Sequence, residues 1–102
     1  MTFMQQPQDT KAVVGSNVFF PCTYVGTRGV PRWMINQTSH GVSRLPLRHS
    51  YNGTGLMVHG VDVFMNETQY QCCFRIHIGR GVFESICSSA GMLFISAGTK
   101  FS

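Results

Sequence analysis

Cysteine is the residue with the most definite chemistry in this sequence. The chain of 102 residues has four cysteines, namely Cys22, Cys72, Cys73 and Cys87. An even set in a chain of this length is compatible with two disulfide bonds, which persist in oxidising compartments outside the cytosol. Three Asn-x-Thr sequons, at Asn36, Asn52 and Asn66, are candidate sites of N-glycosylation in secreted chains. Each sequon alone is also typical of an ordinary turn. Together, these features predict an extracellular protein.

The ionisable side chains do not predict an enzyme or a metal site. The four histidines are His40, His49, His59 and His77. They share no short spacing of the kind found in zinc motifs. The four acidic residues form no pair suited to general acid–base catalysis. Residues 79–81, Gly-Arg-Gly, lack the strand–loop–helix context of a phosphate-binding loop. We therefore expect a binding protein that has no catalytic residues, cofactor or metal.

The charge distribution argues against a nucleic acid as the partner. The formal net charge is +4 at pH 7. The basic residues are nevertheless scattered, and no run of five or more occurs. A mildly basic surface is the simplest interpretation, and the alternative is an acidic partner or an anionic glycan.

The length predicts a single domain over residues 1–102, because such a chain is too short for two cores. Hydrophobic residues make up 43% and charged residues 12%, a balance that favours a folded core over disorder. No stretch approaches the roughly 18–20 apolar residues that cross a bilayer. Residues 1–4 also lack the basic start of a secretory signal. We therefore expect the leader and any membrane anchor to lie outside this sequence, as parts of a longer extracellular protein.

Short β-strands are expected to position these residues. No segment sustains the apolar period of a helix, and eleven glycines and four prolines divide the chain into short alternating pieces. Within the first long strand, Pro21 predicts an edge contact or a bulge. Short strands at 42–45 and 47–49 remain an alternative, which Pro46 weakens. The pattern indicates an all-β sandwich or barrel. The expected strands are residues 3–6, 17–24, 32–35, 55–59, 69–78 and 82–95.

Four residues form an ordered constellation within these strands. Trp33 follows Cys22 by eleven residues, and Tyr70 precedes Cys72 by two. This order resembles the immunoglobulin superfamily, which has a strand B cysteine, a strand C tryptophan and the strand F Tyr-x-Cys of the tyrosine corner. The segment 56–61 also resembles strand E of that family, and residues 90–95 resemble its strand G. The resemblance covers about residues 6–96.

The resemblance implies an antiparallel sandwich of two sheets, with a disulfide between Cys22 and Cys72 packed against Trp33. By chain entropy, a loop of 50 residues would make this bridge worth about 4 kcal/mol. The resemblance also implies that the Tyr70 hydroxyl bonds to a backbone group at a corner. The cysteine spacing suits an intermediate-type or short variable-type domain. Asn66 stands where the family has an acidic residue, so the usual ion pair with an arginine near strand D is absent or replaced.

The remaining cysteines, Cys73 and Cys87, are expected to form a second bridge. Side chains alternate along a strand, so Cys73 points away from the core. If residues 79–81 form a hairpin loop, residues whose numbers sum to 160 lie opposite each other, and Cys73 faces Cys87. The same register places Glu84 in the inner row opposite Ile76, which counts against it. Two free thiols, or a free Cys73 that links two chains, are the alternatives.

The resemblance implies a recognition module of a cell-surface receptor or adhesion molecule that binds a protein, including a second copy of itself, through its G–F–C face. An exposed aromatic side chain beside an arginine is typical of interface centres. Equally open is a strand C that covers the aromatic and leaves a solvated polar pair. The candidate binding residues are Arg75, His77, Arg80, Phe83 and Ser85.

The alternative function is recognition of an acidic glycan by Arg75, His77 and Arg80. The sialic-acid-binding relatives place an arginine three residues after the corner tyrosine. This chain has Cys73 at that position, so the resemblance to that group fails at its key residue.

Overall fold

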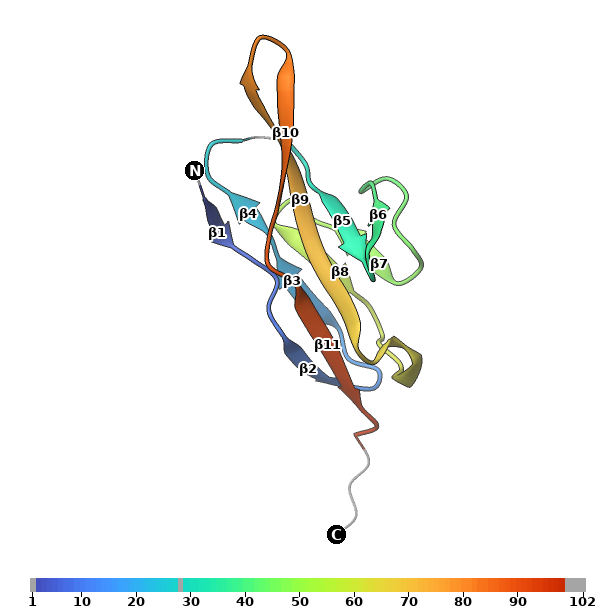
Figure 1. Cartoon of the computed structure of the whole chain (residues 1–102). Helices are drawn as coiled ribbons and strands as arrows, with labels where there is room; N and C mark the ends of the chain where they lie inside the picture. The colour runs from blue at the N-terminus through green and yellow to red at the C-terminus, as the bar shows by residue number, and fades with distance from the viewer. Residues whose placement is uncertain (1, 28, 99–102) are drawn as a thin grey trace.

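The computed structural model describes residues 2–27 and 29–98, which form a β-sandwich without an α-helix. Residues 1, 28 and 99–102 of the expected domain lie outside this description. Figure 1 shows two layers of strands that face each other, with a long hairpin at one end. This architecture confirms the all-β, immunoglobulin-like sandwich expected from the sequence.

The larger layer contains five strands in the order β2 (Thr10–Val13), β11 (Gly91–Ser96), β9 (Thr68–Gly79), β5 (Arg32–Ile35) and β6 (Thr38–His40). A further strand, β10 (Val82–Cys87), pairs with β9 beyond this path. All of these pairs are antiparallel except β2 with β11. In the described residues no second edge strand follows β6, as expected from the cysteine spacing.

The facing layer contains β3 (Val18–Pro21), β8 (Gly55–Val58) and β7 (His49–Tyr51), in that order. A separate antiparallel pair joins β1 (Phe3–Gln5) to β4 (Thr23–Tyr24). A single 3-10 turn, η1 (Val63–Met65), connects β8 to β9.

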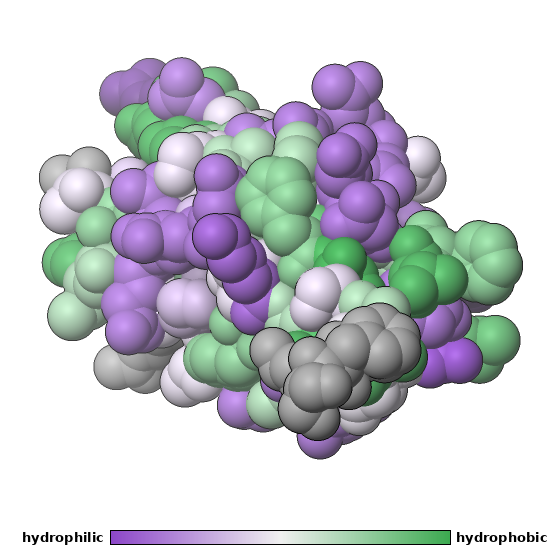
Figure 2. All heavy atoms as spheres, turned by 90° about the horizontal axis from the view of Figure 1, so that it is seen from below, coloured by the Kyte–Doolittle hydropathy of each residue, from purple (hydrophilic) through white to green (hydrophobic). Residues whose placement is uncertain are grey.

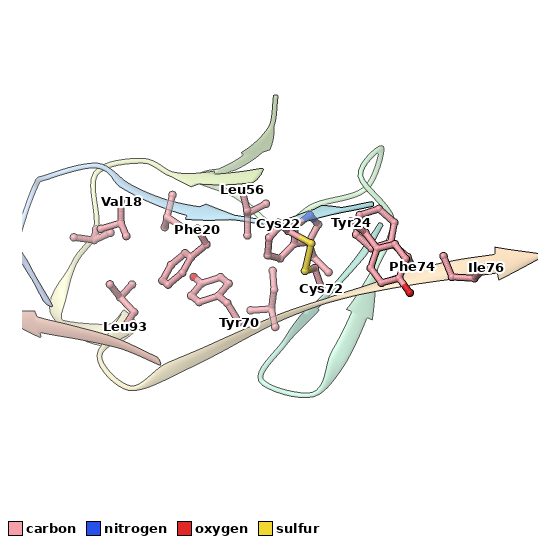
Figure 3. Packing of buried hydrophobic residues seen from close by; sticks show 14 residues of the cluster. Val18, Phe20, Cys22, Tyr24, Leu56, Tyr70, Cys72, Phe74, Ile76 and Leu93 are labelled. Carbon is pink, nitrogen blue, oxygen red and sulfur yellow. A yellow bond between two sulfur atoms is a disulfide. The ribbon is translucent and has the colours of Figure 1, made fainter. Parts of the chain in front are cut away.

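The core lies between the layers and follows the alternation of the strands. Figure 3 shows its side chains in a row between the two layers. Trp33 is fully buried and lies opposite Cys72 in the β5–β9 register. The Cys22–Cys72 disulfide crosses between the layers, with its Cα atoms 6.5 Å apart. The expected core bridge beside Trp33 is therefore confirmed.

Pro21 marks the point where the expected strand 17–24 divides into β3 and β4. The Cys22 amide donates to the Thr54 carbonyl at 2.9 Å. Because successive amide positions face opposite edges of a strand, the Pro21 nitrogen faces away from β8, where no ladder donor is needed. A side chain on Gly55 would also meet the Pro21 Cα at 2.8 Å. Close approach of β3 and β8 therefore requires glycine there.

The alternative strands at 42–45 and 47–49 are wrong, because turns occupy most of both segments. The strands lie on either side, as β6 and β7. Val42 and Leu45 pack against the core from this loop, so their apolar character anchors a turn rather than a strand. The expected strand 82–95 also divides, because residues 88–90, which belong to no strand, separate β10 from β11.

Candidate recognition surface

The β9–β10 hairpin extends beyond the body of the sandwich (Figure 1). β9 pairs with β11 at residues 68–70 and with β5 at residues 70–73. From residue 74 onward, its pairing partner among the described residues is β10. The end of the hairpin is thus a two-stranded ribbon, which is marginally stable in isolation.

A disulfide between Cys73 and Cys87 closes the base of this ribbon, with Cα atoms 3.9 Å apart. Cys73 pairs directly with Cys87, and the expected register holds as far as His77 opposite Phe83. All four cysteines are therefore bridged, and the alternatives with free thiols are wrong.

The register differs from expectation at the tip, where Val82 pairs with Gly79 instead of Ile78. Arg80 and Gly81 both have positive φ, at 40° and 77°, and this turn shifts the pairing by one residue. The expected inner pair of Ile78 and Val82 is consequently exposed, at 58% and 54%.

Glu84 lies opposite Ile76, as expected. This charged residue of the inner row is nevertheless not buried, because the core ends at Ile76. Ile76 is buried and stands last in the row of core side chains in Figure 3. Glu84, on the outer strand, is exposed. The inner row of the hairpin therefore contacts the core through β9 and through Ile86 of β10, and it leaves Glu84 in solvent.

The opposite face of the hairpin carries four of the expected binding residues, which we call the outer cluster: Arg75, His77, Phe83 and Ser85. The Arg75 guanidinium carbon lies 4.5 Å from the centre of the Phe83 ring. The His77 ring centre lies 5.0 Å from that of Phe83. Phe83 is 47% exposed, so the alternative in which strand C covers it is wrong. Arg80 lies apart from this cluster, in the turn.

A groove of about 680 Å³ lies beside the outer cluster. We call it the hairpin groove. One wall comes from the hairpin, and the other comes from β5, β6 and the segment before them. The Cys73–Cys87 bridge lines it as well. Its lining includes Val30, Arg32, Met34, Ser39, Arg75 and Phe83.

Sequence reasoning missed the β5 side of this groove. Because side chains alternate along a strand, an inward Trp33 implies that Arg32 and Met34 point outward, and the sequence alone carries this signal. The pairing of Arg32 with Cys73 joins distant parts of the chain, and spacing alone does not reveal it. In the structure the Arg32 Nε donates to the Ser39 Oγ at 2.7 Å.

Comparisons with known proteins agree with this architecture. A scan of protein-family models and a search of curated protein sequences gave no match. Among solved structures, "Crystal Structure of Duf (Kirre) D1" matches with a TM-score of 0.75 and 25% identity, over 92% of this chain and 94% of that one. This chain is an immunoglobulin-like domain.

Two larger structures match this immunoglobulin-like domain as well. "Tandem Ig repeats of Dlar" gives a TM-score of 0.72 at 22% identity and covers 93% of the domain. "Crystal Structure of Rst D1-D2" gives 0.69 at 24% identity and covers 91%. The domain spans 47% of each of those chains, or about half their length.

The immunoglobulin-like domain departs from the expected tyrosine corner in the partner of Tyr70. The Tyr70 hydroxyl lies 2.8 Å from the His49 Nε2, so the expected bond to a backbone group is wrong. The His49 Nδ1 lies 2.8 Å from the Leu47 carbonyl, which accepts only. Nδ1 therefore carries the proton, and Nε2 accepts from the tyrosine.

Burial sets the ionisation of this pair. Desolvation lowers the pKa of His49, and the nearby His40 and His59 lower it further, against the backbone contacts that raise it. Burial also raises the pKa of Tyr70. Both groups are thus held neutral, which is the state in which the Tyr70 hydroxyl donates and the His49 Nε2 accepts.

The sequence predicted that the family's usual ion pair is absent or replaced. The structure contains a replacement, at the end of the sandwich opposite the hairpin. Arg48 lies 3.6 Å from Asp62 and donates to the Gly60 carbonyl. Asp62 also caps η1, because its Oδ1 accepts from the Phe64 amide at 2.9 Å. Asn66, at the position of the family's acid, accepts from the Ile95 amide at 2.8 Å.

The same end exposes apolar side chains of its own. Phe64 is 93% exposed and Val63 is 50% exposed. Figure 2 views the molecule from this side and shows hydrophobic and hydrophilic surface interspersed. Phe64 thus offers an exposed phenylalanine far from the hairpin.

All three sequon asparagines are exposed; Asn36 and Asn66 lie in turns, and Asn52 lies directly before a bend. The Asn36 Oδ1 accepts from the Gln69 amide, and the Asn52 Oδ1 accepts from the Thr54 amide. The turn roles considered from the sequence are therefore real. None of the three asparagines lines the hairpin groove.

Two absences hold for residues 2–27 and 29–98. In this part of the chain there is no helix of the length and apolar character that crossing a membrane requires. The same residues contain no group of three or more His, Cys, Asp or Glu placed to hold a metal ion.

Proposed function

We propose that this immunoglobulin-like domain is the extracellular recognition module of a cell-surface receptor or adhesion molecule, and that it binds a protein partner through its G–F–C face. Here β10, β9 and β5 form that face. The observation that carries the proposal is the half-exposed Phe83, which lies under Arg75 beside the hairpin groove. Aromatic and arginine side chains of this kind dominate the centres of protein interfaces.

The bridged hairpin supports this proposal, because a binding surface gains affinity when it is rigid before it meets its partner. The Cys73–Cys87 bridge joins the two strands immediately below the outer cluster. The hairpin therefore loses little further conformational entropy when the partner binds.

The extracellular location is supported by two disulfides in a chain of 102 residues. We further propose that glycans occupy Asn36, Asn52 and Asn66. Glycans at these turns leave the hairpin groove open, since none of the three asparagines lines it. The domain is proposed as one unit of a longer protein whose membrane anchor lies outside this sequence.

We also propose that the groove binds without catalysing a reaction. The Ser39 hydroxyl accepts from Arg32, and a serine nucleophile would instead need a neighbouring base to take its proton. The polar groups of the groove are therefore arranged as hydrogen-bonding partners.

The test uses fluorescent tetramers of the domain on cells of the source organism. Phe83→Ala is expected to lower cell binding at least about tenfold, as for an interface hot spot. Phe64→Ala is the matched control, because it removes an exposed phenylalanine from the other end. Trypsin treatment of the cells should abolish binding, and neuraminidase should not.

Equal binding by the Phe83→Ala and Phe64→Ala tetramers would contradict the proposed face. Sedimentation of the free domain from about 1 µM to about 1 mM, a range that covers weak association, separates the two kinds of protein partner. A concentration-dependent dimer that Phe83→Ala dissociates indicates self-recognition, and a monomer indicates a different protein.

A further inference from the structure

We propose that the hairpin groove receives an acidic side chain of a protein partner, which Arg32 and Arg75 hold, while an apolar neighbour of that acid packs against Phe83. This inference rests on the proposed function and names the chemistry of the partner. It also replaces Arg80 and His77, which were expected from the sequence, with Arg32 as the second cation of the site.

Both arginines carry positive charge that the described residues do not neutralise. Within residues 2–27 and 29–98, the one ion pair recorded joins Arg48 to Asp62, at the other end of the sandwich. Arg32 uses its Nε on Ser39, which leaves its two terminal nitrogens for a ligand. The Arg75 side chain contacts the ring of Phe83, and its guanidinium makes no hydrogen bond to the described part of the chain.

Strand register places the two guanidinium groups on the same face. Arg32 lies opposite Cys73, and Arg75 follows two positions later on β9, so both side chains point away from the core. Both line the hairpin groove. Two like charges that share a groove repel each other, and a carboxylate between them relieves that repulsion while accepting charge-assisted hydrogen bonds.

The rest of the lining determines what accompanies the acid. Val30 is 60% exposed and Phe83 is 47% exposed, and Met34 of β5 lines the same groove. These side chains offer apolar surface, which also strengthens the arginine bonds by excluding water. A peptide in which Asp or Glu adjoins an aromatic or branched residue matches this combination.

Charge also decides between classes of partner. A second copy of the domain would bring the same arginines against themselves, and its net charge is +4. A sugar would place its hydroxyls against Val30, Met34 and Phe83, which offer them no hydrogen bonds. Glu84, on the lining, disfavours a densely anionic polymer. The groove therefore best fits a single acid within an apolar protein segment.

The first experiment selects a displayed library of random 12-residue peptides on the immobilised, fully bridged domain. The expected result is enrichment of peptides that carry Asp or Glu next to an aromatic or branched residue. The best peptide is then titrated by fluorescence polarisation. Replacing its acid by the amide should weaken binding about tenfold, the loss expected for a charge-assisted bond.

Matched variants locate the binding site of that peptide. Arg32→Gln and Arg75→Gln should each weaken it about tenfold. Lys11→Gln, on the exposed side of β2, removes the same charge at a distant edge and should change it less than about twofold. Non-reducing mass spectrometry checks that every variant has both bridges, and the amide region of its NMR spectrum checks that it is folded.

Several results would overturn the inference. The first is enrichment of peptides that lack Asp and Glu. The second is a selection that yields no peptide whose binding depends on the groove. The third is equal binding of the peptide by the Arg75→Gln and Lys11→Gln variants. If 3′-sialyllactose binds instead, and the arginine variants abolish that binding, the groove belongs to a glycan. Loss of cell binding in Phe83→Ala with full binding in both arginine variants refutes this inference and leaves the proposed function intact.

Discussion

The two halves of β9 are held in place by different means, although one peptide bond separates them. Up to Cys72, the strand pairs first with β11 and then with β5, and Tyr70 and Cys72 are fully buried. Beyond Cys73, its pairing partner in the described part of the chain is β10. The first half, which we call the lower half, forms the centre of the fold. The second half, the upper half, projects into solvent.

The difference teaches how one strand serves both stability and recognition. In the lower half, burial fixes the strand, since Trp33, Phe20 and Leu93 are fully buried around it. In the upper half, burial fades after Ile76, and a covalent bond holds the ribbon instead. The adjacent cysteines point to opposite sides because side chains alternate, so each half has its own disulfide.

The largest effect is expected from removing the core bridge. Replacing Cys22 and Cys72 together by alanine should lower the free energy of unfolding by about 4 kcal/mol, because the bridge closes a loop of 50 residues. Urea denaturation followed by Trp33 fluorescence measures this loss. A loss below about 1 kcal/mol would show that packing alone holds the lower half.

Removing the hairpin bridge should cost less overall. Replacing Cys73 and Cys87 by alanine should lower the free energy of unfolding by about 1–2 kcal/mol, toward the low end for disulfides, because the ribbon opens locally before the core does. Amide hydrogen exchange should speed up about tenfold or more in residues 82–86 and stay unchanged at residues 70–72. Faster exchange in both regions would contradict the division of β9 into two halves.

A smaller effect is expected from acid. The pKa of His49 is lowered in the fold, so the unfolded chain takes up its proton first as the pH falls below the ordinary histidine value of about 6.5. Stability should be greatest above that pH and should fall below it. His49→Gln should lose less stability between pH 7 and pH 5 than the parent, as thermal melts at each pH would show.

The outcome for His49 needs a control, because His40 and His59 act on it and Tyr70 faces it directly. His59→Gln keeps His49 and should retain most of the acid sensitivity. If His59→Gln and His49→Gln flatten the pH profile equally, the Tyr70–His49 pair is not its source.

The smallest effect is expected at the recognition surface. Phe83→Ala should change the free energy of unfolding by no more than about 1 kcal/mol, since the half-exposed ring contributes chiefly its contact with Arg75. Phe20→Ala, in the core, should cost about 3–5 kcal/mol. A large loss in Phe83→Ala would mean that the outer cluster supports the fold rather than a partner.

The sequence allowed the lower half of β9 to be predicted almost completely. Cys22, Trp33 and Cys72 are signals of type and spacing, and each is local to its own strand. The hairpin register was likewise predictable as far as Phe83, because a short loop fixes which residues face each other. It failed at Val82, where the backbone of Arg80 adopts a positive φ.

The features that were missed depend on contacts between distant segments. β2 alternates exposed and half-buried residues, which gives a weak pattern. Nothing near Tyr70 in the sequence indicates His49, which the loop before β7 brings to it. Arg32 and Ser39 join the groove through the pairing of β5 with β6 and β9. Such pairings follow from topology rather than from composition.

The adjacency of Cys72 and Cys73 has a mechanical consequence. The two bridges and the peptide bond between them form one continuous covalent path from Cys22 to Cys87, bypassing sequence separations of 50 and 14 residues. At about 3.5 Å per residue, on the order of 200 Å of contour length is withheld from extension. A force applied across the two ends of the domain therefore passes through sulfur, and even the fully unfolded domain remains a short tether.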